Sequence, residues 1–322
     1  MKDYFKFNLT GKQLLPIWLV FMALVVVPYV YTIYNHVTTL GQKLNAPPGS
    51  IADAVKLMLG TMLVIVIIGY AIFFFIAKIS IENTEYKAEN LLFDGKFGSF
   101  IGMFLKGIIL SIITIGIYIP WFTKNIYSFF AKNTSHKTDR FQFLSKGAQL
   151  FKIAILYYIL PLIIVSILIR IFFGSGTEHP ILKNTVTQIT TLFIAIPFMY
   201  LRYKWTVNVK YKEYIIQWDT DFWISCKTIL LQVFLSIITI GIYYPLAMVK
   251  LYKYFAERTV AVSDTSTKKF GYDIEPQDDF LFIWGQLLLT FITLGIYYPW
   301  GFCKIADRIS SKTYVEEVAV TE

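Results

Sequence analysis

Long apolar runs, separated by short polar segments, make up most of the chain. A helix needs about 20 apolar residues to cross the hydrocarbon core of a bilayer, and seven runs approach or exceed that length. These runs span residues 14–34, 54–76, 98–122, 150–173, 186–201, 222–249 and 280–302. The pattern predicts a mainly α-helical, polytopic membrane protein.

The polar segments before the third, fourth and sixth runs carry a different pattern. They read ISIENTEYKAENLLFDGKF, KNTSHKTDRFQFLSKG and KWTVNVKYKEYIIQWDTDF, and each mixes β-branched and aromatic residues in partial alternation. Such alternation, ending at Gly, Asp or Ser, is typical of a strand or hairpin. The N-terminal YFKFNLTGK and residues 268–275 are weaker versions, whereas residues 35–53 and 174–183 have loop composition. We therefore expect short β-like modules between the membrane segments.

The chain also contains internal repeats. A shift of 125 residues aligns residues 83–134 with 208–259 without a gap, and 20 of the 52 aligned positions are identical. A third copy of the core, TFITLGIYYPW, follows 54 residues later, and the first two runs match the fourth and fifth in outline. These repeats predict a first unit of three runs (1–134), a second unit of three runs (135–259) and a half-unit with the last membrane segment (260–322).

The repeated core reads Thr-x-Gly-Ile-Tyr-x-Pro. Glycine adopts backbone conformations that end a helix, and proline has no amide hydrogen with which to continue one. We therefore expect one helix to end near Gly116 and another to begin with Pro120 in its first turn. The segments that follow the three breaks are amphipathic and basic, which suits helices at the membrane surface.

Hydroxyl residues precede each break at a spacing of three, as Ser111 and Thr114 do, so each pair shares one helix face. Two interpretations stay open. The hydroxyls pack helices and bond the backbone, or the three faces converge on a polar pocket, as broken helices do in transporters. The candidate pocket or pore residues are Thr114, Gly116, Tyr118, Pro120, Thr239, Gly241, Tyr243, Pro245, Thr293, Gly295, Tyr297 and Pro299.

Lysines within or beside the apolar runs are the candidates for contact with lipid headgroups. They are Lys106, Lys227, Lys250 and Lys304. A long lysine side chain also reaches the membrane surface merely to hydrate its charge, so a specific contact and simple snorkelling both remain open.

The distribution of positive charge distinguishes two topologies. If all seven runs cross, the two sides carry 12 and 13 Lys and Arg, which gives no preference. If the third, sixth and seventh runs turn back at their motifs, the counts become 23 and 2. We prefer the second arrangement, which puts the N-terminus and every β-like module in the cytoplasm, where the modules can pair into one sheet.

Composition narrows the class of protein further. Hydrophobic residues make up 56% of the chain and charged residues 16%, which excludes an ordinary soluble enzyme. The net charge of +9 fits segments beside anionic lipid, and we expect no nucleic-acid binding. Cys226, Cys303 and three scattered histidines (His36, His136 and His179) suggest neither a disulfide nor a metal site, and no motif indicates a cofactor or an enzymatic reaction.

The cores ITIGIYYPL and ITLGIYYPW, each followed by a Thr about 14 residues after its proline, carry a family resemblance. The three copies of the core, each with its threonine, are residues 114–121 with Thr134, 239–245 with Thr259, and 293–300 with Thr313. The chain resembles the YjgN-like family of bacterial inner-membrane proteins, a domain-of-unknown-function family. Leu246 stands where the family usually has Trp, and the basic run after the motif is thin. The resemblance implies a multi-pass inner-membrane protein and brings no activity or catalytic residue.

Two functions follow as hypotheses. The first is a transporter or channel-like protein that moves a small solute, ion or lipid past the motif turns. The second is a non-catalytic envelope scaffold or maintenance protein, whose cytoplasmic β-modules bind a partner protein. Membrane lipids are the expected partners under both hypotheses, and the oligomeric state stays open.

Overall fold

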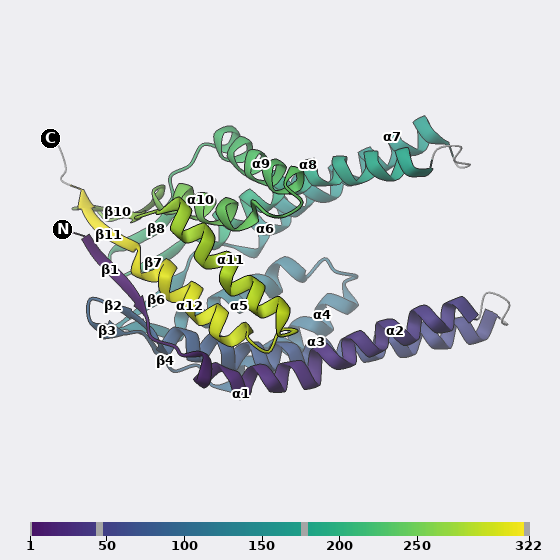
Figure 1. The fold of residues 1–322 in the computed structure, drawn as a ribbon, viewed down its shortest axis with the longest axis horizontal. Coiled ribbons are helices and arrows are strands. Elements are labelled where there is room, and N and C mark those ends of the chain that lie inside the picture. The colour runs from purple at the N-terminus through teal and green to yellow at the C-terminus, as the bar shows by residue number, and fades with distance from the viewer. Residues whose placement is uncertain (1, 43–47, 175–179, 319–322) are drawn as a thin grey trace.

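The computed structural model describes residues 2–42, 48–174 and 180–318. Within these residues, four helices are long and apolar enough to cross a membrane. They are α1 (Gly11–Phe21) continued by η1 (Met22–Val26) and α2 (Val27–Gln42), α3 (Pro48–Glu82), α6 (Gly147–Ala154) continued by η2 (Ile155–Ile159) and α7 (Leu160–Phe173), and α8 (Pro180–Thr206). They correspond to the first, second, fourth and fifth apolar runs, and they extend as two antiparallel pairs away from the sheet (Figure 1).

Two of these helices contain a π-helical turn just before a proline. The amide of Val27 bonds to the carbonyl of Met22, and Pro28 follows. In the second turn the amide of Leu160 bonds to the carbonyl of Ile155, and Pro161 follows. Proline lacks the amide for the usual helical bond and crowds the carbonyl four residues earlier, and a wider turn is a common way for a helix to accommodate such a break. The first and fourth runs thus share this feature at equivalent places.

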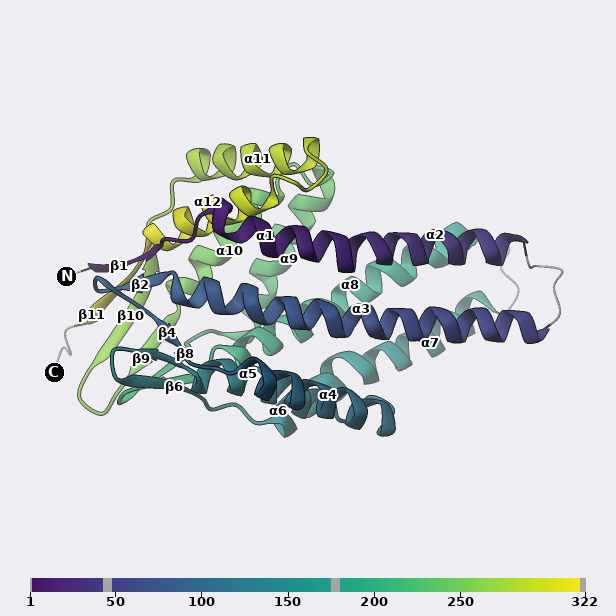
Figure 2. The same cartoon turned by 90° about the horizontal axis from the view of Figure 1, so that it is seen from below.

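The other three runs are helical hairpins. Their helices are α4 (Phe97–Ile113) with α5 (Ile119–Lys132), α9 (Phe222–Ile238) with α10 (Tyr244–Ala256), and α11 (Pro276–Ile292) with α12 (Tyr298–Ser311). The predicted break is confirmed, because α4 ends three residues before Gly116 and Pro120 lies in the first turn of α5. Each hairpin begins and ends beside the sheet, so the arrangement in which these runs cross as single helices is wrong (Figure 2).

Eleven short strands form one antiparallel sheet at the end of the molecule that holds both chain termini (Figure 1). Their order is β3-β2-β1-β11-β10-β9-β8-β7-β6-β5-β4. The strands are β1 (Lys2–Phe7), β2 (Thr84–Tyr86), β3 (Glu89–Asn90), β4 (Leu92–Phe93), β5 (Thr134–His136), β6 (Asp139–Phe143), β7 (Val209–Tyr211), β8 (Tyr214–Trp218), β9 (Thr259–Val262), β10 (Thr267–Tyr272) and β11 (Thr313–Val318). The prediction that the β-like modules share one sheet is confirmed.

The sheet is almost a closed barrel. Its two end strands, β3 and β4, are separated by one residue, so the segment 89–93 pairs with β2 through its first half and with β5 through its second. His136 reinforces this seam from β5. Its Nε2 donates to the carbonyl of Tyr86 (3.0 Å), and its Nδ1 lies 2.8 Å from the hydroxyl of Tyr211. The arrangement leaves little open strand edge to pair with another chain.

The helices are arranged in the same circular order as the strands. Neighbours pack in the order α1, α12, α11, α10, α9, α8, α6, α5, α4, α3 and back to α1. Small apolar clusters fix helices to the sheet, and one of them joins Phe93 of β4 to Phe74, Phe100 and Phe129. Farther from the sheet the four long helices expose apolar side chains, and none of the most apolar window of Gly147–Phe173 is buried. A lipid environment would cover these surfaces.

Candidate functional site

The backbone amides of each motif turn are bonded within the turn. Thr114 Oγ1 accepts a hydrogen bond from the amide of Tyr118 at 3.0 Å and donates to the carbonyl of Leu110 at 2.7 Å. Thr239 and Thr293 do the same in their turns, again 3.0 Å from the tyrosine amide. The threonine hydroxyls therefore form hydrogen bonds to the backbone, as the first of the two interpretations expects.

The glycines of the motif have the left-handed conformation that the turn requires. Gly116 has φ +87°, and Gly241 and Gly295 have φ +84° and +87°. Each glycine amide bonds to the carbonyl five residues earlier, at 2.7 Å for Gly116. The prolines then start the returning helix, and Pro245 and Pro299 are almost fully buried. The motif is thus a compact reversal in which local polar groups replace water.

The tyrosines carry a short polar chain on the second and third hairpins. Tyr243 donates from its hydroxyl to Gln232 Oε1 (3.0 Å) and accepts from Lys250 Nζ (3.0 Å). In the third copy, Tyr297 makes the equivalent bonds, at 2.9 Å each. Two of the four headgroup candidates, Lys250 and Lys304, thus bond to motif tyrosines, whereas Lys106 and Lys227 are exposed on α4 and α9.

The first hairpin replaces this polar chain by apolar packing. Gly107 stands at the position of Gln232, and a Cβ added to it would lie 2.1 Å from the ring of Phe122. Phe122 in turn aligns with Ala247 and Gly301 in the other copies. In the first copy the small residue is on the first arm and the large one on the second arm. In the other two copies the large residue, a glutamine, is on the first arm and the small one on the second. Asn125 donates to the Tyr118 hydroxyl at 3.4 Å, the weaker counterpart of the lysine bond.

Two tryptophans fix the turns to neighbouring helices. The Trp18 indole donates to the carbonyl of Gly295 at 2.9 Å, and the Trp284 indole donates to the carbonyl of Ile242 at 2.7 Å. The third turn is therefore held by α1 and the second by α11. The structure brings together the motif residues of one copy, and the larger of the two cavities described next lies beside a single hairpin.

A long apolar groove of about 1000 Å³ runs beside the second hairpin. In the described part of the chain its walls come from α8, β8 and the two helices of that hairpin. The lining residues are Met199, Tyr200, Tyr203, Trp218, Ile229, Gln232, Val233, Ser236, Ile237, Ile240, Gly241, Tyr244, Ala247, Met248, Leu251, Tyr252 and Phe255. It reaches from the turn, at Ile240, to the sheet, where Trp218 stacks on Phe255 with 4.2 Å between ring centroids.

A smaller, polar pocket of about 440 Å³ lies on the adjacent face of α8 and shares Trp218 with the groove. Lys152 of α6 and Lys204 of α8 give it positive charge. Lys204 also donates to the carbonyl of Thr220 at 3.1 Å, which holds its ammonium group beneath the sheet. Trp218 therefore separates an apolar compartment from a cationic one. No sequence signal pointed to either cavity, because its walls combine residues from separate helices and strands that only the folded chain brings together.

Comparison with known proteins gives the family. A family model described as "Bacterial protein of unknown function (DUF898)" matches residues 88–269, more than half of the chain. The chain belongs to DUF898. This is the family also called YjgN-like, so the resemblance drawn from the motif is confirmed. No curated protein and no solved structure is significantly similar to the chain. The matched region of this DUF898 protein includes the groove and the polar pocket and ends before the third hairpin.

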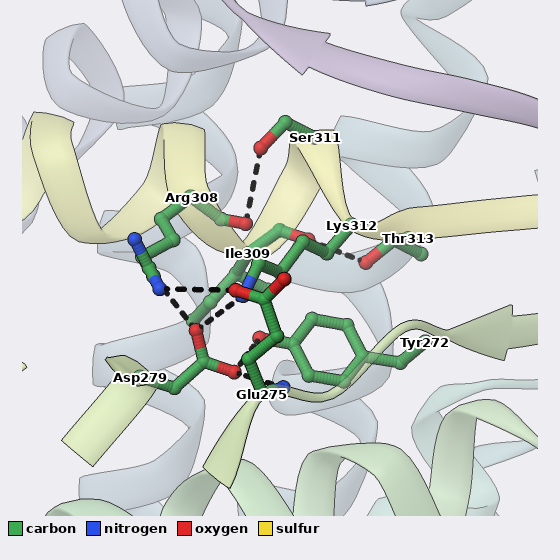
Figure 3. A network of polar contacts seen from close by, with 8 residues as sticks. All are labelled: Tyr272, Glu275, Asp279, Arg308, Ile309, Ser311, Lys312 and Thr313. Carbon is green, nitrogen blue, oxygen red and sulfur yellow. Dashed lines mark hydrogen bonds and ion pairs between the residues drawn. The ribbon is translucent and has the colours of Figure 1, made fainter. Parts of the chain in front are cut away.

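The third hairpin of the DUF898 protein is fixed to the sheet by a buried ion-pair network (Figure 3). Asp279, only 1% exposed, accepts from Arg308 Nε at 2.7 Å and from Lys312 Nζ at 2.6 Å. Its other oxygen accepts from the amide of Glu275 (3.0 Å) and the hydroxyl of Tyr272 (3.3 Å). Burial opposes the charge on Asp279, but hydrogen bonds from Lys312 and Arg308 outweigh burial and hold its pKa below the usual value.

The motif tryptophan of the DUF898 protein also has a structural role that explains its absence from the second copy. Trp121 covers Gly147, the first residue of α6, and Trp300 covers Gly11, the first residue of α1. A Cβ on either glycine would lie less than 3 Å from the indole. The second hairpin is followed by α11 rather than by a spanning helix that begins with glycine, and there Leu246 stands in place of Trp.

The described residues contain no group of three or more His, Cys, Asp or Glu that could hold a metal ion. The carboxylates that come closest to such a group, Glu275 and Asp279, are already paired with Arg308 and Lys312. The site therefore offers a hydrophobic groove, a cationic pocket and self-contained turns.

Proposed function

We propose that this protein binds membrane lipid, with an acyl chain in the groove beside the second hairpin. It would do so in the bacterial inner membrane, with the sheet and the N-terminus in the cytoplasm. The observation that supports this proposal most directly is the groove itself, which has the volume of a ligand site and a lining dominated by apolar and aromatic side chains.

The length of the groove fits one acyl chain. Tyr244 and Phe255 of α10 both line it, and the helix between them rises about 16 Å at 1.5 Å per residue. The hydrocarbon of one leaflet is about 15 Å thick, half of the bilayer core. The groove between the turn and the sheet is therefore about as long as one acyl chain.

The chemistry of the lining favours lipid over an ion or a polar solute. An ion path through a membrane is lined by carbonyls, carboxylates or other charged groups. None of the residues that line the groove is charged, and Gln232 and Ser236 are the polar members on α9. Gln232 is already bonded to Tyr243, and Ser236 donates to the carbonyl of Gln232. A lipid tail needs no polar partner, so it suits these walls.

The test measures native lipid that stays bound. The protein is extracted with its surrounding lipid, exchanged into mild detergent, and the retained lipid is quantified by mass spectrometry. Met248→Trp adds bulk inside the groove, whereas Ile238→Trp adds the same bulk on an exposed face outside it. We expect Met248→Trp to lose most of the retained lipid and Ile238→Trp to keep it. Equal retention by both variants, or no retention by the wild type, would contradict the proposal.

A further inference from the structure

The most exposed apolar residues of the hairpins stand at one equivalent position. Ile115, Ile240 and Leu294 follow the motif threonines and are 93%, 92% and 84% exposed. The residues around them, such as Phe291 and Ile292, are exposed as well. Three separate turns of one molecule thus present bare hydrocarbon tips, and isolated patches of this kind mark an interaction surface.

The backbone conformation at these tips is energetically unfavourable for the apolar residues that occupy them. Ile115, Ile240 and Leu294 have φ of +50°, +49° and +51°. This left-handed conformation is unfavourable for a β-branched or bulky residue, and Asn adopts it more readily. A tip facing water would favour Asn at such a turn. The apolar residue is expected where the surroundings are hydrocarbon, and the amides of each turn are bonded within the turn, so lipid need not solvate them.

The depth of the hairpins matches one leaflet. Counting from each tip along the returning helix, the first cation comes nine or ten residues later, at Lys124, Lys250 and Lys304. At 1.5 Å per residue this is about 14–15 Å, which is half of a hydrocarbon core of about 30 Å. The helix positions of these lysines are therefore level with the headgroups of the sheet-side leaflet when the tips reach the bilayer midplane, and the ammonium groups of Lys250 and Lys304 bond to Tyr243 and Tyr297.

The four spanning helices, in contrast, contain 25–28 residues each and are long enough for both leaflets. In the described part of the chain, one leaflet then holds ten helices and the other holds four. The hairpins lie toward the sheet and end short of the far ends of α2, α3 and α7 (Figure 2). With a helix diameter of about 10 Å, the six additional arms add on the order of 500 Å² of cross-section to that leaflet alone.

We propose that the protein is a one-leaflet wedge that prefers, and stabilises, membrane that is convex on the side of the sheet. The three hairpins expand the sheet-side leaflet, and the partner of their tips is the hydrocarbon at the bilayer midplane. The proposal does not depend on lipid binding in the groove, because it rests on the length and position of the hairpins.

The test compares curved with flat membrane. The protein carries a fluorophore on Asp264→Cys, an exposed position between β9 and β10, in a Cys226→Ser background. It is reconstituted into giant vesicles, from which narrow tubes are drawn, and an impermeant quencher identifies the molecules whose sheet faces outward. We expect several-fold enrichment in the tubes for outward sheets and depletion for inward sheets. Equal distribution of the two orientations would overturn the proposal.

A variant with polar tips tests the cause. Ile115→Asn, Ile240→Asn and Leu294→Asn together suit the left-handed backbone, so the turns keep their shape while the tips become polar. This variant should lose most of the orientation-dependent sorting. The matched control, Ile189→Asn on an exposed face of the spanning helix α8, should sort as the wild type does. Unchanged sorting by the polar-tip variant would overturn the proposal.

A depth measurement completes the experiment. A spin label on Ile115→Cys should respond to oxygen dissolved in the hydrocarbon and stay shielded from a water-soluble relaxation agent. Accessibility of that label to the water-soluble agent would overturn the proposal even if sorting were observed. The groove variant Met248→Trp should sort normally, which separates failure of the wedge from failure of lipid binding.

Discussion

Asp279 and Arg308 join the two arms of the third hairpin at its base, with 2.7 Å between the carboxylate oxygen and the guanidinium Nε. The second copy places Ser225 and Tyr254 at the same two positions, bonded hydroxyl to hydroxyl at 3.1 Å. The first copy places Phe100 and Phe129 there, with 5.4 Å between ring centroids. At this position of the repeat the two arms are joined by an ion pair in the third copy, by a neutral hydrogen bond in the second and by aromatic packing in the first.

Loss of the charge on Asp279 should destabilise the third hairpin strongly. Asp279→Asn leaves Arg308 and Lys312, 24% and 16% exposed, without their buried counter-ion. Breaking a buried pair in this way costs about 3–5 kcal/mol. Thermal unfolding in detergent measures the effect, and Asp278→Asn, at an exposed neighbouring position, should have little effect. An Asp279→Asn protein as stable as the wild type would contradict this assignment.

The same network should make stability fall at acid pH. Since the pKa of Asp279 in the folded protein lies below its usual value of about 3.9, its contribution is fully present above that value. The contribution is lost as the pH falls through the lower, folded pKa. Unfolding temperatures of wild type and Asp279→Asn, measured between neutral pH and about pH 3, should therefore converge only below about pH 4. Convergence already at neutral pH would argue against an ionised Asp279.

Crowding the contact between Trp121 and Gly147 should also destabilise the protein. In Gly147→Ala the new methyl would lie 2.8 Å from the indole, and overpacking of this kind costs about 1–3 kcal/mol. Gly102→Ala is the matched control, because nothing lies within 4 Å of its Cβ position and alanine favours the helix. The addition of Trp121→Leu should restore part of the stability that Gly147→Ala loses. Unfolding in denaturant measures all three proteins.

Removal of the motif hydroxyl should loosen the turn. In the wild type the amide of Tyr243 donates to Thr239 Oγ1 at 3.0 Å, and the valine of Thr239→Val cannot accept this hydrogen bond. An unpaired amide beside lipid costs about 1–3 kcal/mol. Amide exchange at Tyr243 should accelerate. Thr228→Val on the same helix loses only a bond to a carbonyl that the helix already uses, so its exchange should stay as in the wild type. Equal protection in both variants would show that the threonine does not hold the turn.

His136 should hold the seam of the barrel closed. His136→Leu leaves the carbonyl of Tyr86 and the hydroxyl of Tyr211, both part-buried, without the imidazole, and the loss of these bonds costs about 1 kcal/mol each. Hydrogen exchange should rise in β2 and β5, on the two sides of the seam. Tyr211→Phe removes one of the two bonds and should have a smaller effect. An unchanged exchange pattern in His136→Leu would mean that strand pairing alone closes the seam.

Local signals were sufficient to predict much of this fold. Glycine at 116 and proline at 120 predict the end of one helix and the start of the next because both effects act on the backbone within a few residues. The alternating pattern of residues 139–143 predicts β6 for the same reason. Positive charge outside the apolar runs predicted that the hairpins return to the side of the sheet.

Features that depend on distant partners were missed. Strands β9 and β11 lie in short segments after the motif helices, and their pairing with β8, β10 and β1 decides their structure. Asp279 looked like an ordinary residue of a polar connector, since its partners Arg308 and Lys312 follow about 30 residues later. The groove and the polar pocket combine residues from α6, α8, β8 and the second hairpin. The division into three units stays a prediction.

Closure of the ring of strands has a consequence for biogenesis. Lys2 pairs with Glu316, so β1, the first of the described strands along the chain, waits for β11, the last of them. Until then both flanking edges can be captured by other chains. A product that stops before Thr313 would keep those edges open permanently. Pairing of β11 therefore completes the sheet, and a protease that recognises unpaired strands would distinguish a chain truncated before β11 from one that includes it.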